Sequence, residues 1–159
     1  MLRWLICAIA ILGFWLSNPD PACARLEQHV EAPGRVLYKS LLKLRDSNRD
    51  TWQVVLFKWV ENGCVTDLDL RLVGFPGRAE FQHPQNLVLA AGNRLWQAPD
   101  RYATEAPTPN IGQFDLTEIL PELPSASAVE LTLPTTEMLT LKVPMSAIAE
   151  WQVVRRQSQ

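Results

Sequence analysis

Residues 68–84, LDLRLVGFPGRAEFQHP, decide how the rest of the chain folds. From position 67 to 72 charged residues alternate with leucines, so the leucines fall on one face of an extended chain. A period of two is typical of a β-strand with one buried face. The FPG sequence at 75–77 then ends the strand, because proline cannot donate to a β-ladder and glycine accepts the positive φ of a tight turn. The stretch therefore predicts a strand, a turn and a second short extended run that ends at the HP sequence of 83–84.

Two segments upstream extend this strand into a β-meander. Residues 51–60, TWQVVLFKWV, are rich in β-branched and aromatic residues and are apolar on both faces, which is typical of a central strand. Residues 36–44 alternate as a strand does; their leucine spacing also fits a helix, but the polar turn at 46–50 and the strand after it favour a hairpin. Asn62-Gly63 is a strong hairpin signal. We therefore predict three antiparallel strands joined by short turns.

The second half of the chain alternates short strand patterns with proline-rich segments. A long surface loop is predicted at 99–112, which has three prolines and no periodicity. A short helix is predicted at 115–123, with Asp115 as its N-cap, and a closing helix at 145–154. Residues 25–33 are predicted to be loosely held. Further short strands are predicted at 78–82, 87–91, 94–97, 129–133 and 138–143.

These patterns predict the fold class. We expect a mainly β domain with an antiparallel meander sheet, curled into either an open barrel or a sandwich, and two short helices. The chain outside the predicted leader has the size of one ordinary domain and is long enough to bury a core.

The start of the chain, residues 1–24, has the layout of a secretory signal peptide. A positive charge precedes an apolar run at 5–16 that is too short to span a bilayer, and the small residues ending at Ala24 fit the cleavage pattern. We predict cleavage after Ala24 and export of residues 25–159 as a single β-rich domain. An uncleaved membrane anchor and lipidation of Cys23 are the alternatives.

Charge and cysteine content narrow the classes of protein. The formal net charge is −2, so no basic excess indicates a nucleic-acid partner. Cys64 is the one cysteine outside the predicted leader, so no internal disulfide is expected, and we expect Cys64 to pack as a small apolar residue at a strand start. The two histidines, His29 and His83, lack the spacing of a metal site, and no cofactor motif is present, so neither a metal nor a cofactor is predicted.

His83 is the histidine with the stronger case for a chemical role. A general base needs a carboxylate or hydroxyl partner, and Glu80 lies three residues before it. The alternative, which we prefer, is that His83 ends a strand and hydrogen-bonds to the backbone before Pro84.

A second candidate is the polar face of the strand before the FPG turn. Asp67, Asp69 and Arg71 share this face, with neighbouring side chains about 6.5–7 Å apart. Carboxylates at that spacing suit acid–base work on a sugar, with Asp67 or Asp69 as the base and Arg71 as an anion clamp. The alternative, which we prefer, is a solvated strand face of little energetic weight.

Four residues are predicted to contact a ligand or partner. Trp52 and Trp59 fall on opposite faces of one strand, so either one of them lies on a contact surface or a helix or loop covers the second face. Phe75, in the predicted turn, and His83 complete the set.

The order of several short motifs resembles a family of small exported cyanobacterial proteins of unknown function, domain of unknown function 3122. The motifs are LRD at 44–46, WQVV at 52–55, LRLVGFPG at 70–77, HPQ at 83–85, VP at 143–144 and EWQ at 150–152. The resemblance implies an exported setting, either the periplasm or the thylakoid lumen. It implies no activity, cofactor or catalytic residue. In the first hairpin turn a glycine is expected, and this chain has Arg49-Asp50 instead.

The sequence favours a non-catalytic accessory or binding module of the extracytoplasmic space. Its expected partner is either a membrane-associated protein complex or a small apolar ligand held within the sheet. The rival hypothesis is a hydrolase that uses His83 with Glu80 or Asp69. A third hypothesis is a membrane-tethered protein that keeps its leader or carries a lipid at Cys23.

Overall fold

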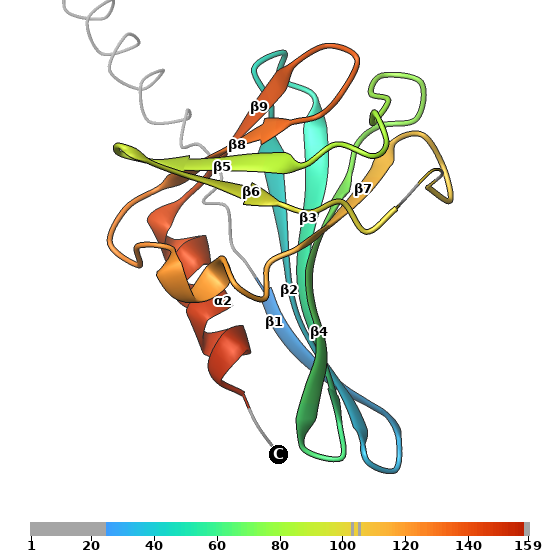
Figure 1. Cartoon of the computed structure of the whole chain (residues 1–159), viewed down its shortest axis with the longest axis vertical. Coiled ribbons are helices and arrows are strands. Elements are labelled where there is room, and N and C mark those ends of the chain that lie inside the picture. The colour runs from blue at the N-terminus through green and yellow to red at the C-terminus, as the bar shows by residue number, and fades with distance from the viewer. Residues whose placement is uncertain (1–24, 103, 105, 158–159) are drawn as a thin grey trace, which may run out of the picture.

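Two antiparallel β-sheets pack together in the computed structural model, which describes residues 25–102, 104 and 106–157 (Figure 1). One sheet has five strands in the order β1-β2-β3-β4-β7, and the other has four in the order β6-β5-β8-β9. The described residues also form one α-helix, α2 (Met145–Arg156), and one 3-10 turn, η1 (Leu120–Glu122). The strands are β1 (Arg25–Ala32), β2 (Arg35–Arg45), β3 (Thr51–Glu61), β4 (Cys64–Val73), β5 (Leu87–Ala91), β6 (Arg94–Ala98), β7 (Ile111–Asp115), β8 (Val129–Leu133) and β9 (Leu139–Val143). The predicted mainly β fold is confirmed, as a sandwich-like pair of open sheets.

The predictions for the start of the chain concern residues that the structure does not describe. The signal peptide at 1–24, its cleavage site at Ala24 and the alternative lipid site at Cys23 all lie outside the described residues. From residue 25 onward, no helix that the structure describes has the length and apolar character needed to cross a membrane. Export stays a prediction from the sequence.

β2, β3 and β4 form the predicted meander, and β3 lies at the centre of the five-stranded sheet. The β2–β3 turn is held by Asp46, whose Oδ1 accepts hydrogen bonds from the backbone N–H groups of Asn48 at 2.8 Å and Asp50 at 2.9 Å. Arg49 occupies the turn in which a glycine was expected, and its φ of 68° lies in the left-handed region. The hydrogen bonds to Asp46 therefore hold this turn in a conformation that its own sequence disfavours.

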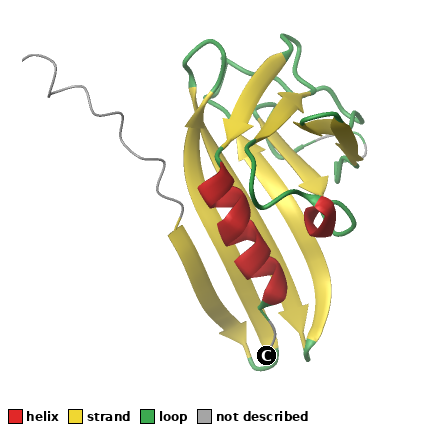
Figure 2. Ribbon diagram, turned by 90° about the vertical axis from the view of Figure 1, so that its left-hand side faces the viewer, coloured by secondary structure: helices red, strands yellow, loops and turns green. Residues whose placement is uncertain are grey.

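One face of the five-stranded sheet forms the hydrophobic core. The four-stranded sheet and α2 both lie on this face (Figures 1 and 2). Trp52 from β3, Phe114 from β7 and Trp151 from α2 are fully buried there. The Nζ of Lys58, on the same face of β3, donates hydrogen bonds to backbone carbonyls at the C-terminal end of α2. The helix is therefore fixed to the sheet both by apolar packing and by a buried cation.

The opposite face of β3 is covered by cationic side chains. Val55, Phe57 and Trp59 point to this side. The guanidinium of Arg35 lies 4.3 Å from the centre of the Trp59 ring, and that of Arg71 lies 5.2 Å from the centre of the Phe57 ring. The expectation that a helix or the proline loop covers this face is wrong for the helix, because α2 packs on the core face.

Three local predictions in the first half of the domain are wrong. Residues 25–33 were expected to be loose, but β1 pairs with β2 across an antiparallel ladder. Residues 78–82 do not form a strand; only Phe81 makes an isolated bridge, with Thr135. Cys64 is exposed at the start of β4 and is not packed. Pairing with β2 orders residues 25–32, whereas residues 78–82 lack a neighbouring strand that pairs along their length, and no packing covers Cys64.

The segment predicted as loop and helix contains a strand. β7 occupies the end of the expected loop, and Asp115 is its last residue, where a helix N-cap was predicted. The Oδ1 of Asp115 accepts a hydrogen bond from the N–H of Thr117 at 2.8 Å, which is an Asx turn and not a helix cap. The helix predicted at 115–123 is reduced to η1.

Candidate functional site

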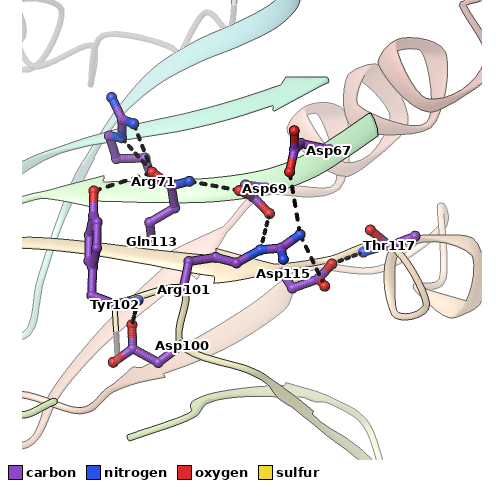
Figure 3. Close-up of polar contacts among 9 residues, drawn as sticks. All are labelled: Asp67, Asp69, Arg71, Asp100, Arg101, Tyr102, Gln113, Asp115 and Thr117. Carbon is purple, nitrogen blue, oxygen red and sulfur yellow. Dashed lines mark hydrogen bonds and ion pairs between the residues drawn. The ribbon is translucent and has the colours of Figure 1, made fainter. Parts of the chain in front are cut away.

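The segment that follows β6 joins the two sheets. Asp100 forms an isolated β-bridge with Phe114 of β7, and the N–H of Arg101 donates to the carbonyl of Gln113 at 2.8 Å. This pairing uses the edge of β7 that faces away from β4. It brings the side chains of Arg101 and Tyr102 onto the polar side of β4 and β7 (Figure 3).

Arg101 lies among three carboxylates on β4 and β7 (Figure 3). Its Nε donates to Oδ1 of Asp69 at 2.9 Å. Its Nη2 lies 3.2 Å from Oδ2 of Asp115 and 3.8 Å from Oδ1 of Asp67. Burial by itself would lower the pKa of Arg101, but the hydrogen bond to Asp69 and the charges of the three carboxylates outweigh it and raise that pKa. Arg101 therefore stays charged and binds these two strands together.

Asp69 is the buried member of this cluster. Only 3% of its side chain is exposed, and its second oxygen accepts a hydrogen bond from Nε2 of Gln113 at 2.7 Å. Burial raises the pKa of Asp69, while the hydrogen bonds from Arg101 and Gln113 act in the opposite direction. The prediction of a solvated strand face is therefore wrong for Asp69.

Gln113 extends the cluster toward Arg71 and Tyr102. Its Oε1 accepts hydrogen bonds from Nε and Nη2 of Arg71 at 3.0 and 2.7 Å, and from the Tyr102 hydroxyl at 3.3 Å. Arg71, predicted as an anion clamp, is thus hydrogen-bonded to an amide and lies over the Phe57 ring.

His83 is paired with Asp100 and not with Glu80. The Nδ1 of His83 lies 2.5 Å from Oδ2 of Asp100, and the two side chains are 8% and 3% exposed. The other carboxylate oxygen of Asp100 accepts the N–H of Tyr102 at 2.9 Å. The Nε2 of His83 is buried and has no hydrogen-bond partner among the described residues. The preferred prediction, a hydrogen bond from His83 to backbone, is also wrong.

The structure joins most of the predicted catalytic residues into one polar network. It runs from His83 through Asp100 and Tyr102 to Gln113, which bonds to both Arg71 and Asp69. Asp69 then connects the network to Arg101. Asp100, Arg101 and Gln113 were not predicted. Asp100 and Arg101 lie in the segment without periodicity, Gln113 directly follows it, and no local motif links any of the three to β4. Glu80 is exposed and takes no part in this network.

The predicted contact residues fall in three different environments. Trp52 is buried in the core, where its Nε1 donates to Oδ2 of Asp46 at 2.9 Å. Trp59 is partly exposed beneath Arg35 on the outer sheet face. Phe75 is 67% exposed in the segment after β4. Of the three aromatic residues, Phe75 is the one with most of its side chain available to a partner.

A depression is lined by residues of the β8–β9 turn and of the segment after β4 that carries Phe75. These two segments come together at one end of the molecule (Figure 1). The depression has a volume of about 170 Å³. Met138, which is 80% exposed, follows one of its lining residues in the β8–β9 turn. We call it the loop-end depression, and its lining residues are Gly77, Arg78, Ala79, Glu80, Thr135, Thr136, Glu137 and Leu139.

A family model with the description "protein of unknown function (DUF3122)" matches residues 24–154. The chain belongs to this family. The match runs from β1 into α2, so the polar network and the loop-end depression are both within the DUF3122 region. The comparisons with curated proteins and with solved structures found no match. The family that the motifs indicated is therefore confirmed.

In the polar network of this DUF3122 domain, the two groups best suited to acid–base chemistry, His83 and Asp69, are both buried. A carboxylate paired with Nδ1 of an imidazole is the arrangement that orients a general base. A base must also reach the proton that it removes, and here the free nitrogen of His83 is enclosed. Asp69 is likewise occupied, because Arg101 and Gln113 take one of its oxygens each. Within the described residues, no group of three or more His, Cys, Asp or Glu side chains is placed to hold a metal ion.

Proposed function

We propose that this DUF3122 protein is a non-catalytic binding module that acts outside the cytoplasm, in the periplasm or the thylakoid lumen. The predicted signal peptide at 1–24 supports export. Its contact surface is the loop-end depression with Phe75 and Met138. The partner is a protein, such as a component of a membrane-associated complex.

The observation that carries this proposal is the contrast between the two candidate sites. The groups that would do chemistry, His83 and Asp69 above all, are buried and bonded to their neighbours. Phe75 and Met138 are instead large apolar side chains left mostly in water, and they belong to the two segments that line the depression. Fully burying a side chain of this kind stabilises a complex by about 1.5–3 kcal/mol. A partner that covered both segments would remove both apolar side chains from water.

The size of the depression favours a protein partner over a small apolar ligand. Pockets for small molecules usually enclose about 300–1,000 Å³, whereas this depression measures about 170 Å³. That volume suits one side chain of a partner. The space between the sheets is filled by buried side chains that include Trp52, Phe114 and Trp151.

The free-energy cost of association sets a minimum area for the contact between this protein and its partner. Loss of translational and rotational freedom costs at least about 4 kcal/mol, which is comparable to what Phe75 and Met138 contribute by burial. A stable partner must therefore cover more of this end of the molecule, including the neighbouring β2–β3 turn. Asp50 of that turn is bound to Arg78 of the depression at 3.1 Å, so the two loops form a continuous surface.

Site-specific photocrosslinking in the native host tests the proposal. A photoreactive residue is placed at Phe75, at Met138 or, as a control, at Val65. Val65 is 51% exposed and follows the β3–β4 turn, which lies at the opposite end of the molecule (Figure 1). We expect Phe75 and Met138 to crosslink to the same protein and Val65 not to. The same products from all three positions, or none from Phe75 and Met138, would contradict the proposal.

Hydrolysis is the second candidate, because the His83–Asp100 pair has the geometry of an oriented imidazole. Wild type and His83→Ala are assayed on a panel of chromogenic esters and glycosides. Turnover by the wild type that is lost in a folded His83→Ala protein, with partner crosslinking retained, would replace the binding module with an enzyme. The mass of the mature N-terminus separates both from a membrane-tethered form.

A further inference from the structure

The charges around the loop-end depression are unbalanced. Arg78 is the basic residue of the lining, and its Nη2 is already paired with Oδ1 of Asp50 at 3.1 Å. Glu80 and Glu137 also line the depression, and both are exposed. Neither carboxylate has an ion-pair partner in the part of the chain that the structure describes. The surface therefore offers two negative charges on the same two segments that carry the exposed side chains of Phe75 and Met138.

We propose that the loop-end depression receives a lysine or arginine side chain of the protein partner, with an apolar residue next to it that packs against Phe75 and Met138. The inference rests on the proposed function and specifies its partner. A long basic side chain suits this site because its hydrocarbon stem and its charged head need different surroundings. Ala79 and Leu139 provide apolar contact for the stem, and Glu80 and Glu137 provide charge for the head.

The walls of the depression are held in place before any partner binds. The N–H of Thr136 donates to the carbonyl of Glu80 at 3.0 Å, and the N–H of Gln82 donates to the carbonyl of Pro134 at 2.8 Å. The amide of Gln82 adds a side-chain hydrogen bond to the Thr136 hydroxyl at 2.9 Å. These bonds join the two segments that line the depression. A preformed site loses less conformational entropy on binding, so contacts at a small surface count for more.

An array of short random peptides, incubated with the purified protein at low salt, tests the partner chemistry. We expect the retained peptides to be enriched in lysine or arginine beside an apolar residue. The peptide that binds best is then titrated in solution against wild type and against the double variant Glu80→Gln/Glu137→Gln. We expect the affinity to fall roughly three- to thirtyfold in this variant, as two exposed ion pairs predict, and to fall with added salt in the wild type.

The control variant is Glu118→Gln/Glu130→Gln, which removes the same charge from two exposed residues outside the depression. We expect its affinity for the peptide to stay within about twofold of wild type. Enrichment of acidic or purely apolar peptides, or equal losses in both double variants, would overturn the proposal. Stronger binding to vesicles of neutral phosphatidylcholine than to any peptide, lost in Phe75→Ala, would also overturn it and identify a lipid surface instead.

The two proposals fail in different ways. Crosslinking from Phe75 and Met138 without any preference for basic peptides leaves the contact surface in place and removes the basic anchor. Absence of crosslinking removes both. The peptide titration uses substitutions at Glu80 and Glu137 alone, so its result does not depend on altering Phe75 or Met138.

Discussion

The Nδ1 of His83 lies 2.5 Å from Oδ2 of Asp100, and both side chains are almost fully buried. The two residues are 17 positions apart and belong to the segments that precede β5 and follow β6. Asp100 also forms a β-bridge with Phe114, so the pair lies where the four-stranded sheet meets the five-stranded sheet. His83 therefore helps to hold the two sheets together.

Asp100→Ala should lower the free energy of unfolding by about 1–3 kcal/mol, because it leaves a buried imidazole nitrogen without its partner. His83→Ala should cost a similar amount, and the double variant should cost clearly less than the two single losses added together. Urea denaturation of all four proteins measures this. Strictly additive losses would show that the pair contributes no coupling energy.

Arg101→Gln should destabilise the fold by about 1–3 kcal/mol near neutral pH, because Asp69 would keep its charge in a buried position with a weaker donor. Arg71→Gln is the matched control, since Arg71 is exposed and its partner is neutral. We expect its effect to stay within about 0.5 kcal/mol.

The loss in Arg101→Gln should depend on pH. Burial raises the pKa of Asp69 above its ordinary value, and Arg101 opposes that rise, so removing Arg101 raises the pKa further. A carboxyl with a raised folded pKa binds protons more readily when folded, so its contribution to stability falls as pH rises through that pKa. The deficit relative to wild type should therefore shrink as the pH is lowered toward the ordinary aspartate value of about 3.9. A deficit that is constant with pH would show that Asp69 is not responsible.

Lys58→Met should loosen the C-terminal end of α2. The Nζ of Lys58 donates to the carbonyls of Arg155 at 2.7 Å and Gln157 at 2.6 Å, and methionine cannot replace these bonds. We expect the free energy of unfolding to fall by about 1–3 kcal/mol. Part of this loss is offset, because methionine is uncharged and does not incur the desolvation that lowers the pKa of Lys58. Hydrogen exchange should become faster at the end of α2 and stay unchanged at its start, whereas Lys43→Met, an exposed residue of β2, should alter neither.

Arg49→Gly should stabilise the protein by about 0.5–1 kcal/mol, because glycine adopts a left-handed conformation without the strain that a side chain brings. Arg49 has a φ of 68° in the β2–β3 turn. Arg49→Ala is the control, since it removes the side chain and keeps the Cβ strain. A thermal shift that is the same for both variants would point to the lost charge and not to the backbone.

The meander could be predicted from the sequence because its strands are long and their apolar residues repeat with a period of two. β7 could not be predicted in this way, since its five residues include only two large apolar side chains and a glycine, which is too few to show a period of two. A Cβ at Gly112 would lie 2.7 Å from the Phe81 ring and 2.8 Å from the Phe114 ring, so this glycine is required by packing between segments. Such a contact leaves no trace in local periodicity.

The residues of the candidate site also fall into those that could be predicted from the sequence and those that could not. Asp67, Asp69 and Arg71 were correctly placed on one strand face, because alternation along a single strand determines which side chains share a face. The partners Arg101 and Gln113 come from segments more than 30 residues away along the chain. Their identity depends on how the chain returns to the sheet.

The sequence by itself determined the β-rich class, the three-stranded meander and the family, since these depend on short-range periodicity and on motifs that can be read in order. Only the tertiary structure decided that His83 pairs with Asp100, that Asp69 is buried, and that the segment after β4 lines a depression together with the β8–β9 turn. The physical reason is that burial and ion pairing depend on distances through space. Those distances are set by the pairing of strands that are far apart in the sequence, and the local pattern of each strand does not specify that pairing.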